Sequence, residues 1–196
     1  MSAHLSPESA MVTVLFADIR NFTAFADRAT AREAVDYLNA FFATAIPIVE
    51  RRRGYVHQLL GDGLLAAFGA VEPLPDHADR ALAAGVEMLE AVDQQLGDRW
   101  RIGIGINSGL VVVGTIGAGA HRRLGIIGDP VNVASRVEAA TRDLGEPLLA
   151  TEATRCLLDG GASALEPCGD LLLKGKVRPV GVHRLRVRNG CRTPLA

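Results

Sequence analysis

The sequence lacks several kinds of segment, and each absence excludes a class of protein. Residues 1–10 have neither a basic start nor an apolar stretch, so they do not resemble a signal peptide. The longest apolar runs, such as residues 11–17 and 109–113, are far too short to cross a bilayer. The three cysteines are widely spaced and match no metal-ligand pattern. These absences favour a cytoplasmic protein with reduced thiols and without membrane insertion.

Charge and length further restrict the possible partners of the protein and the number of its domains. The chain has 196 residues, of which 48% are hydrophobic and 22% charged, and its formal net charge is −1. This balance does not predict nucleic acid or anionic lipid as a partner. A chain of this length and composition is expected to form one globular domain with a full core. We expect residues 11–187 to form that domain, with residues 1–10 as a flexible N-terminus and residues 188–196 as a C-terminal tail.

Strand and helix patterns alternate along this domain. Residues 11–17 form a continuous apolar run that predicts a central strand. Residues 21–53 have a helical pattern, which restarts at a capping box of Thr30 and Glu33. Two apolar runs around Gly-Asp-Gly at residues 61–63 predict a hairpin. We also expect helices at 76–96 and 129–144, the latter with Asp129 as its N-cap, and strands at 100–107, 110–116, 124–127, 148–150, 171–173 and 183–187. The order βαββαβ, with additional strands and helices, predicts a ferredoxin-like α+β sandwich.

Two aspartates are candidate metal ligands. Asp18 stands at the carboxyl end of the first predicted strand, where a lone aspartate is most often a cap or turn residue. Asp62 lies between two glycines, a pattern that is more often just a turn. A hairpin tip beside the first strand would bring both carboxylates together, where they could share two metal ions about 3.5–4 Å apart. The helix start at residues 21–23 would then offer backbone N–H groups to phosphates beside the metals.

Asn132 and Arg136 form a second candidate pair. They stand four residues apart on one predicted helix, so both side chains lie on the same helical face. An ordinary polar face explains this spacing without any function. In a functional interpretation, Arg136 would stabilise charge on a reacting phosphate and Asn132 would orient a ribose.

Five segments of the chain resemble the catalytic domain of class III adenylyl and guanylyl cyclases, and they occur in the family's order. They are residues 16–23 (FADIRNFT), 60–69 (LGDGLLAAFG), 101–109 (RIGIGINSG), 128–136 (GDPVNVASR) and 173–175 (LKG). Each segment is weak evidence alone, but five in order are strong evidence. The resemblance spans residues 12–187 and implies the class III nucleotidyl cyclase fold. It also implies the conversion of a nucleoside triphosphate to a 3′,5′-cyclic nucleotide and pyrophosphate.

In this family two aspartates hold two metal ions. The resemblance therefore implies that Asp18 and Asp62, helped by the backbone carbonyl of Ile19, hold two Mg²⁺ or Mn²⁺ ions in each active site. The amides of Phe22 and Thr23 would meet the phosphates of the nucleotide. The ribose 3′-hydroxyl would then attack the α-phosphate, and pyrophosphate would leave.

Residues later in the chain complete the implied site. Arg101 and Lys174 are implied as clamps on the triphosphate, and Asn132 and Arg136 as the residues that stabilise the transition state. In this family the sites lie at the interface of a head-to-tail dimer, and residues 118–123 match its dimerisation arm. The resemblance therefore implies a homodimer with shared active sites. One protomer would give Asp18, Asp62 and Arg101, and its partner would give Asn132, Arg136 and Lys174.

The chain departs from the family at the two positions that bind the base. Adenylyl cyclases normally carry Lys where this chain has Gln58, and Asp or Thr where it has Gly125. Guanylyl cyclases usually carry Glu at the first position. The amide of Gln58 can both donate to and accept from an adenine, but it can also turn over to meet a guanine. We expect ATP as the main substrate with GTP as a side substrate, and a guanylate cyclase as the alternative.

Two other classes of protein compete with this interpretation. One is a catalytically silent dimerisation module, which the two base-site departures favour and the presence of both metal aspartates opposes. The other is a diguanylate cyclase, whose core fold and two-metal chemistry are similar. That family would show a Gly-Gly-Asp/Glu-Glu-Phe turn, and residues 61–64 match it poorly.

Overall fold

The computed structural model describes residues 7–97 and 100–186 of the chain. Its elements, in order, are β1 (Glu8–Ile19), α1 (Phe22–Ala26), α2 (Ala31–Arg51), β2 (Tyr55–Leu60), β3 (Gly63–Phe68), α3 (His77–Leu96), β4 (Ile102–Ile116), β5 (Arg123–Ile127), α4 (Asp129–Asp143), β6 (Leu148–Thr151), α5 (Glu152–Arg155), β7 (Leu165–Leu171) and β8 (Val180–Leu185). Two short 3-10 turns, η1 (Gly119–His121) and η2 (Gly161–Ala164), lie in the connections. Within these ranges no helix combines the length and hydropathy that a bilayer crossing requires.

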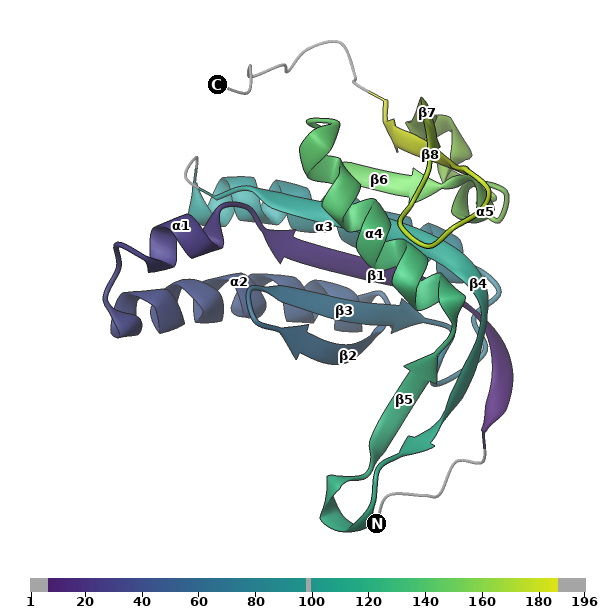
Figure 1. Ribbon diagram of the computed structural model, residues 1–196, viewed down its shortest axis with the longest axis horizontal. Coiled ribbons are helices and arrows are strands. Elements are labelled where there is room, and N and C mark those ends of the chain that lie inside the picture. Colours follow the sequence, from purple (N-terminus) through teal and green to yellow (C-terminus); the bar gives the residue numbers. More distant parts are fainter. Residues whose placement is uncertain (1–6, 98–99, 187–196) are drawn as a thin grey trace.

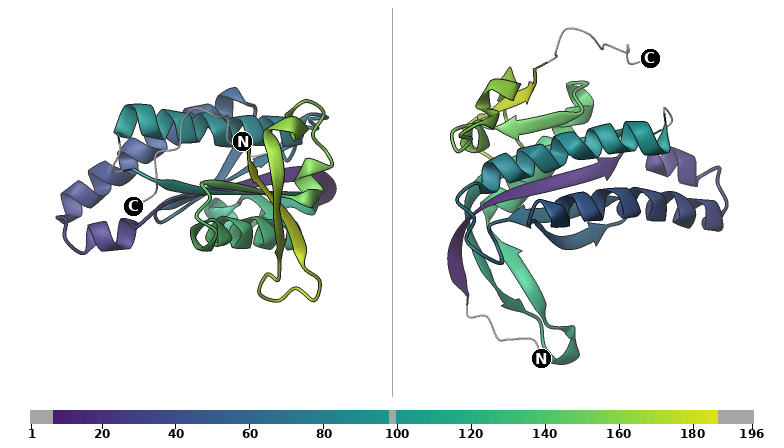
Figure 2. Two further views of the ribbon diagram at one scale, coloured as in Figure 1. Left: turned by 90° about the horizontal axis from the view of Figure 1, so that it is seen from above. Right: turned by 180° about the vertical axis from the view of Figure 1, so that it is seen from behind.

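The strands form one sheet with the order β2-β3-β1-β4-β6-β8-β7, and β5 pairs with the outer part of β4. The strands β4, β1, β3 and β2 are antiparallel neighbours, which confirms the predicted βαββαβ core with its additional strands. Helices α2 and α3 cover one face of the sheet, and α4 crosses the other face (Figures 1 and 2). The architecture is therefore a sandwich with helices on both sides of a mixed sheet.

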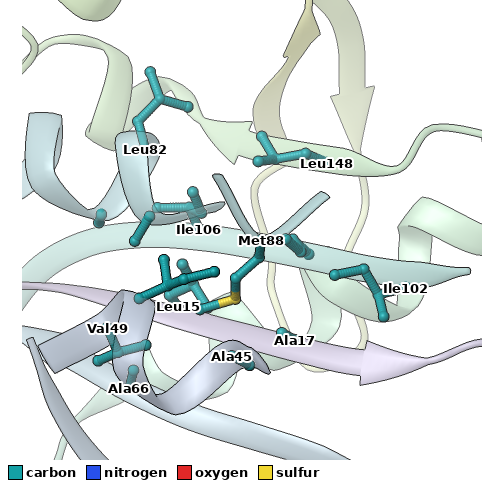
Figure 3. Close-up of a cluster of buried hydrophobic side chains, with 14 of the residues drawn as sticks. Leu15, Ala17, Ala45, Val49, Ala66, Leu82, Met88, Ile102, Ile106 and Leu148 are labelled. Atoms are coloured by element: carbon teal, nitrogen blue, oxygen red, sulfur yellow. The ribbon is translucent and has the colours of Figure 1, made fainter. Parts of the chain in front are cut away.

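Strand β1 is apolar on both faces because both faces are covered. Val14 packs with the hydrophobic cluster under α4, whereas Leu15 and Ala17 belong to the cluster under α2 and α3. Figure 3 shows Leu15 and Ala17 beside Met88 of α3. A strand buried on both faces loses the polar alternation of a surface strand, which explains its continuous apolar run. Of the predicted flexible N-terminus, residues 8–10 belong to this strand and residues 1–6 lie outside the described part.

The capping box that divides the first helical segment is confirmed. The Thr30 hydroxyl accepts from the Glu33 amide at 3.2 Å, and the Glu33 carboxylate accepts from the Thr30 amide at 2.7 Å. This reciprocal cap starts α2 after the short helix α1. Helix α2 then continues through Pro47 to Arg51 and buries Phe41 against the core.

Several predicted boundaries were wrong. The two strands expected at 100–107 and 110–116 are one continuous strand, β4. The N-cap of α4 is Gly128 rather than Asp129, which is the first helical residue. The strand expected at 171–173 is β7, which ends where that prediction began. Strand β8 ends at Leu185, and the predicted tail at 188–196 lies outside the described residues.

The inner part of β4 explains how α4 lies so close to the sheet. Ile102, Ile104 and Ile106 belong to the cluster under α2 and α3, so the intervening glycines face α4. A Cβ at Gly105 would lie 2.5 Å from the backbone oxygen of Ala134, an atom of α4 itself. Two glycines on one face of β4 therefore let the helix backbone rest directly on the strand.

Candidate active site

Asp18 and Asp62 meet at the edge where β1 ends. Asp18 pairs in register with Gly63, and the backbone N–H of Ile19 donates to the carbonyl of Asp62 at 3.1 Å. The β2–β3 hairpin tip thus lies beside the end of β1, as the sequence predicted. A Cβ at residue 63 would lie 2.8 Å from Oδ2 of Asp18, so a glycine there leaves room for the carboxylate.

The surroundings of Asp18 disfavour its negative charge. Burial, followed by the nearby Asp62 carboxylate, raises the pKa of Asp18 to about 6, while Arg142 and Arg20 oppose this rise. Two carboxylates held together in a half-buried place are stabilised by a cation between them. Oxygen donors of this kind are the ligands that Mg²⁺ and Mn²⁺ prefer. The donor set therefore fits a hard divalent cation.

The protein side chains alone make an incomplete cation site. In the ranges 7–97 and 100–186, no group of three or more His, Cys, Asp or Glu side chains is placed to hold a metal ion. Mg²⁺ sites commonly combine one or two carboxylates with substrate phosphates and water. The pair of Asp18 and Asp62, with the backbone carbonyl of Ile19 as the predicted third ligand, suits that kind of substrate-completed site.

The predicted phosphate-binding residues lie next to these carboxylates along the chain. Asn21 has a left-handed backbone with φ of 59°, which turns the chain from β1 into α1, where Phe22 and Thr23 are the first two helical residues. The backbone N–H of Arg20 donates to the carbonyl of Arg101 at 2.7 Å. Arg101 thus lies beside the strand end that carries Asp18, and its side chain is exposed. The structure brings these predicted residues together at one end of the sheet.

Asn132, Arg136 and Lys174 form a second group. Both of the first two lie on α4, and a Cβ at Gly175 would be 3.6 Å from the Arg136 guanidinium. The turn that carries Lys174 is fixed to the helix start by an ion pair of 2.5 Å between Lys176 and Asp129. The late turn and α4 therefore present their charged side chains together.

The two groups are separate within one chain. Figure 1 shows the N-terminal end of α4 beside β5 and far from α1. The candidate residues of one chain thus lie in two groups, one at the end of β1 and one at α4 and the late turn.

The two base-binding candidates lie on neighbouring strands. Gln58 is exposed on β2, directly after a bulge in the pairing with β3, and β2 lies against β5. Gly125 is on β5, and a side chain there would overlap the Cγ1 and Cδ1 atoms of Ile116. Ile116 therefore fills the space that Asp or Thr would occupy at residue 125. Sequence analysis missed this residue, because its contact with Gly125 arises from the register between β4 and β5.

A charged cluster behind Asp18 was also missed. The Arg20 guanidinium donates to the Thr141 hydroxyl at 2.9 Å and to the Glu146 carbonyl at 3.0 Å. Burial, followed by the charge of Asp18, raises the pKa of Glu138 to about 7. These contacts connect the strand end to the last turns of α4. The glycines of β4 at 103 and 105 were the available signal, since they mark a close approach of another element.

Comparison with known proteins assigns the chain to a family. A family model described as the adenylate and guanylate cyclase catalytic domain matches residues 5–186. The chain belongs to this family. The chain is accordingly a class III nucleotidyl cyclase domain, as the five sequence segments indicated, and is called the cyclase domain below.

Solved structures and curated relatives agree with this assignment. The cyclase domain matches the adenylyl cyclase CyaB from P. aeruginosa with a TM-score of 0.83 and 27% identity, over 98% of this chain and 100% of that chain. It matches the guanylyl cyclase Cya2 with a TM-score of 0.81 and 29% identity, over 92% and 94% of the chains. An adenylate cyclase from Anabaena cylindrica is 34% identical over 152 residues, which cover 72% of this chain and 29% of that protein.

The curated relatives are longer than this chain, and the matched structures include cyclases of both substrate types. The cyclase domain spans less than a third of the length of the curated relatives it matches. Structures of both adenylyl and guanylyl cyclases match it with similar TM-scores. Fold similarity therefore does not select between adenine and guanine.

Proposed function

We propose that this cyclase domain is an adenylate cyclase that converts ATP to 3′,5′-cyclic AMP and pyrophosphate at a homodimer interface. The observation that carries the proposal is the approach of Asp18 to Asp62 beside the predicted phosphate-binding residues. Two carboxylates that repel each other in a half-buried place have no structural benefit of their own, but they suit a pair of divalent cations. Members of this family generally use such cations.

A homodimer follows from the separation of the two half-sites. One protomer supplies Asp18, Asp62 and Arg101, and the second supplies Asn132, Arg136 and Lys174. The β4–β5 hairpin supports the presence of a second copy, because it exposes large apolar side chains to between 43% and 60%. They are Leu110, Val112, Ile116 and Ile127. A second copy of the chain would cover them and complete two equivalent active sites.

The proposed mechanism is an intramolecular phosphoryl transfer. Asp18 and Asp62 would hold the two metal ions, which would supply Lewis acidity for the attack of the ribose 3′-hydroxyl and the departure of pyrophosphate. Arg101 and Lys174 bind the triphosphate and hold it in line for the attack on the α-phosphorus. Asn132 orients the ribose, and Arg136 stabilises the charge that develops on the α-phosphate. Phe22 and Thr23 contribute backbone amides to the phosphates.

The base site is compatible with ATP as the main substrate and GTP as a side substrate. Gln58 offers one donor and one acceptor to the edge of a purine, and it can rotate to serve either base. Gly125 offers no side chain, and Ile116 places apolar atoms there instead. A guanylate cyclase is the alternative that these same residues leave open.

A direct assay tests the proposal. The purified protein is incubated with Mn²⁺ and an equal mixture of ATP and GTP, and the products are identified by mass spectrometry. We expect cyclic AMP in excess over cyclic GMP, together with pyrophosphate. Mainly cyclic GMP would contradict the substrate, and the absence of both products with intact nucleotide binding would favour a silent dimerisation module.

Mixed dimers test whether the sites are shared. Asp62→Asn and Arg136→Ala should each lower turnover by about 10²–10³. Mixing the two inactive proteins should restore up to about a quarter of wild-type activity, since half of the dimers are mixed and each has one intact site. Mixing Arg136→Ala with Asn132→Ala is the matched control. These two residues belong to the same half-site, so that mixture should stay inactive.

A further inference from the structure

Four aromatic side chains form a stack at the end of the sheet where Asp18 lies. Tyr37 of α2 is in the middle, with its ring centroid 3.4 Å from that of Trp100 at an interplanar angle of 7°. On its other side the Phe25 ring is 4.4 Å away at 29°, and Phe22 lies 6.1 Å from Tyr37. The stack therefore joins α1, α2 and the start of β4.

This stack is the apolar anchor of α1. The helix has five residues, and none of them is fully buried. A helix this short has no stability of its own in water and depends on packing. Phe22 packs on the main core, and both phenylalanines of α1 contact Tyr37. Removing the Tyr37 ring would thus loosen the segment that follows Asp18.

The other end of the stack connects to the predicted phosphate clamp. Trp100 directly precedes Arg101, and the Arg101 guanidinium donates to the Trp100 carbonyl at 3.0 Å. The carbonyl of Arg101 accepts the backbone N–H of Arg20 at 2.7 Å, two residues after Asp18. Trp100, Arg101 and the carboxylate pair are therefore one connected unit.

We propose that the Tyr37–Trp100 stack is a positioning pair for pyrophosphate recognition, which sets the place of Arg101 relative to the carboxylates. This inference rests on the proposed function, since it concerns the same active site. The stack acts through Arg101, because flat ring contact restricts the direction in which the chain leaves Trp100. A phosphate that engages Arg101 draws its guanidinium away from the Trp100 carbonyl and changes the surroundings of the indole.

The single tryptophan makes this testable by fluorescence. Trp100 is the one tryptophan of the chain, so all indole emission reports on the stack. Wild-type protein is titrated with magnesium pyrophosphate, and its emission is compared with binding measured by calorimetry. We expect a saturable change in emission with the same midpoint as the calorimetric curve.

Two substitutions on α2 separate positioning from general packing. Tyr37→Leu removes the ring contacts with Phe22, Phe25 and Trp100 and should weaken pyrophosphate binding about tenfold, which corresponds to about 1.4 kcal/mol. Tyr37→Phe keeps the ring and should restore binding to within about twofold of wild type. Phe42→Leu is the matched control, because Phe42 packs on the core from the same helix and contacts Phe41 instead of the stack. Its pyrophosphate affinity should equal that of wild type.

The outcomes distinguish this inference from the proposed function. Equal weakening by Tyr37→Leu and Phe42→Leu overturns the inference, as does calorimetric binding without any change in emission or an absence of binding. Cyclic nucleotide formation in those cases would leave the proposed function intact. The expected titrations without cyclic nucleotide formation would support the positioning pair and refute the cyclase activity.

Discussion

Gly105→Ala should push α4 away from the sheet. An added methyl group would lie 2.5 Å from the backbone oxygen of Ala134 and 2.6 Å from Cα of Glu138, and closer still to the Glu138 nitrogen. All three are backbone atoms of one helix, so no side chain can rotate away to make room. The whole helix must move, and with it Asn132 and Arg136.

The change in the free energy of unfolding expected for Gly105→Ala is the sum of two opposing effects. Overpacking in a close-packed interior costs about 1–3 kcal/mol, and a clash with helix backbone belongs at the upper end of that range. Replacing glycine by alanine stabilises the folded state by about 0.4–1 kcal/mol, because the unfolded chain loses freedom. The net loss expected for Gly105→Ala is about 2 kcal/mol in the free energy of unfolding.

Gly103→Ala is the matched control on the same face of the same strand. Its methyl group would meet the Thr141 hydroxyl at 2.6 Å and a Glu138 carboxylate oxygen at 2.7 Å. These are side-chain atoms rather than helix backbone, although the Thr141 hydroxyl is buried and accepts from Arg20, so the net loss should be smaller than for Gly105→Ala. Urea unfolding of both variants and wild type, analysed with a common m-value, measures the difference. A Gly105→Ala protein as stable as the Gly103→Ala protein would refute the direct packing of α4 on β4.

Three further predictions concern other parts of the molecule. Gly125→Asp alone should lower cyclase activity because its side chain meets Ile116. The double variant with Ile116→Ala should recover activity and raise the ratio of cyclic AMP to cyclic GMP. Equal ratios in wild type and the double variant would contradict this role of Ile116. Burial lowers the pKa of His77 below its ordinary value, so below about pH 6.5 the unfolded chain binds a proton that the folded chain does not, and stability falls towards acid pH. His77→Gln should make the fall in the free energy of unfolding between about pH 7 and pH 5 smaller, and an unchanged slope would refute this. Thr30→Ala removes the side-chain cap of α2 and should cost about 1 kcal/mol in urea unfolding, with no loss meaning that the cap is not formed in solution.

Local signals predicted much of the fold correctly. The apolar run of β1, the Gly-Asp-Gly hairpin and the capping box at Thr30 each depend on residues close together in sequence. The approach of Asp62 to Asp18 was predicted as well, although it depends on the pairing of β3 with β1, two strands that are distant in sequence. The structure confirms that approach, and the roles of the two residues as metal ligands remain a prediction.

The continuity of β4 could not be predicted from local pattern. Asn107, Ser108 and Gly109 are typical of a turn, yet they pair with β1 throughout. Asn107 donates to the Pro130 carbonyl at 3.0 Å, and the Ser108 and Thr13 hydroxyls lie 2.7 Å apart. These polar groups are tolerated in a buried strand because distant residues satisfy their hydrogen bonds. The stack of Tyr37 on Trp100 escaped sequence analysis for the same reason, since its partners come from different elements.

The pairing of β1 with β4 has a consequence for how the chain folds during synthesis. Glu8 pairs with Val113 and Ile19 pairs with Ile102, so the partner strand is made long after β1 has left the ribosome. Once β3 has been made it can pair with one edge of β1, but the other edge stays unpaired until β4 emerges, and an exposed apolar edge strand is a hazard for aggregation. Contacts this distant in sequence also slow folding. We therefore expect chains that stop before β4 to require a chaperone to stay in solution, and full-length chains to be rescued when β4 emerges and pairs with β1.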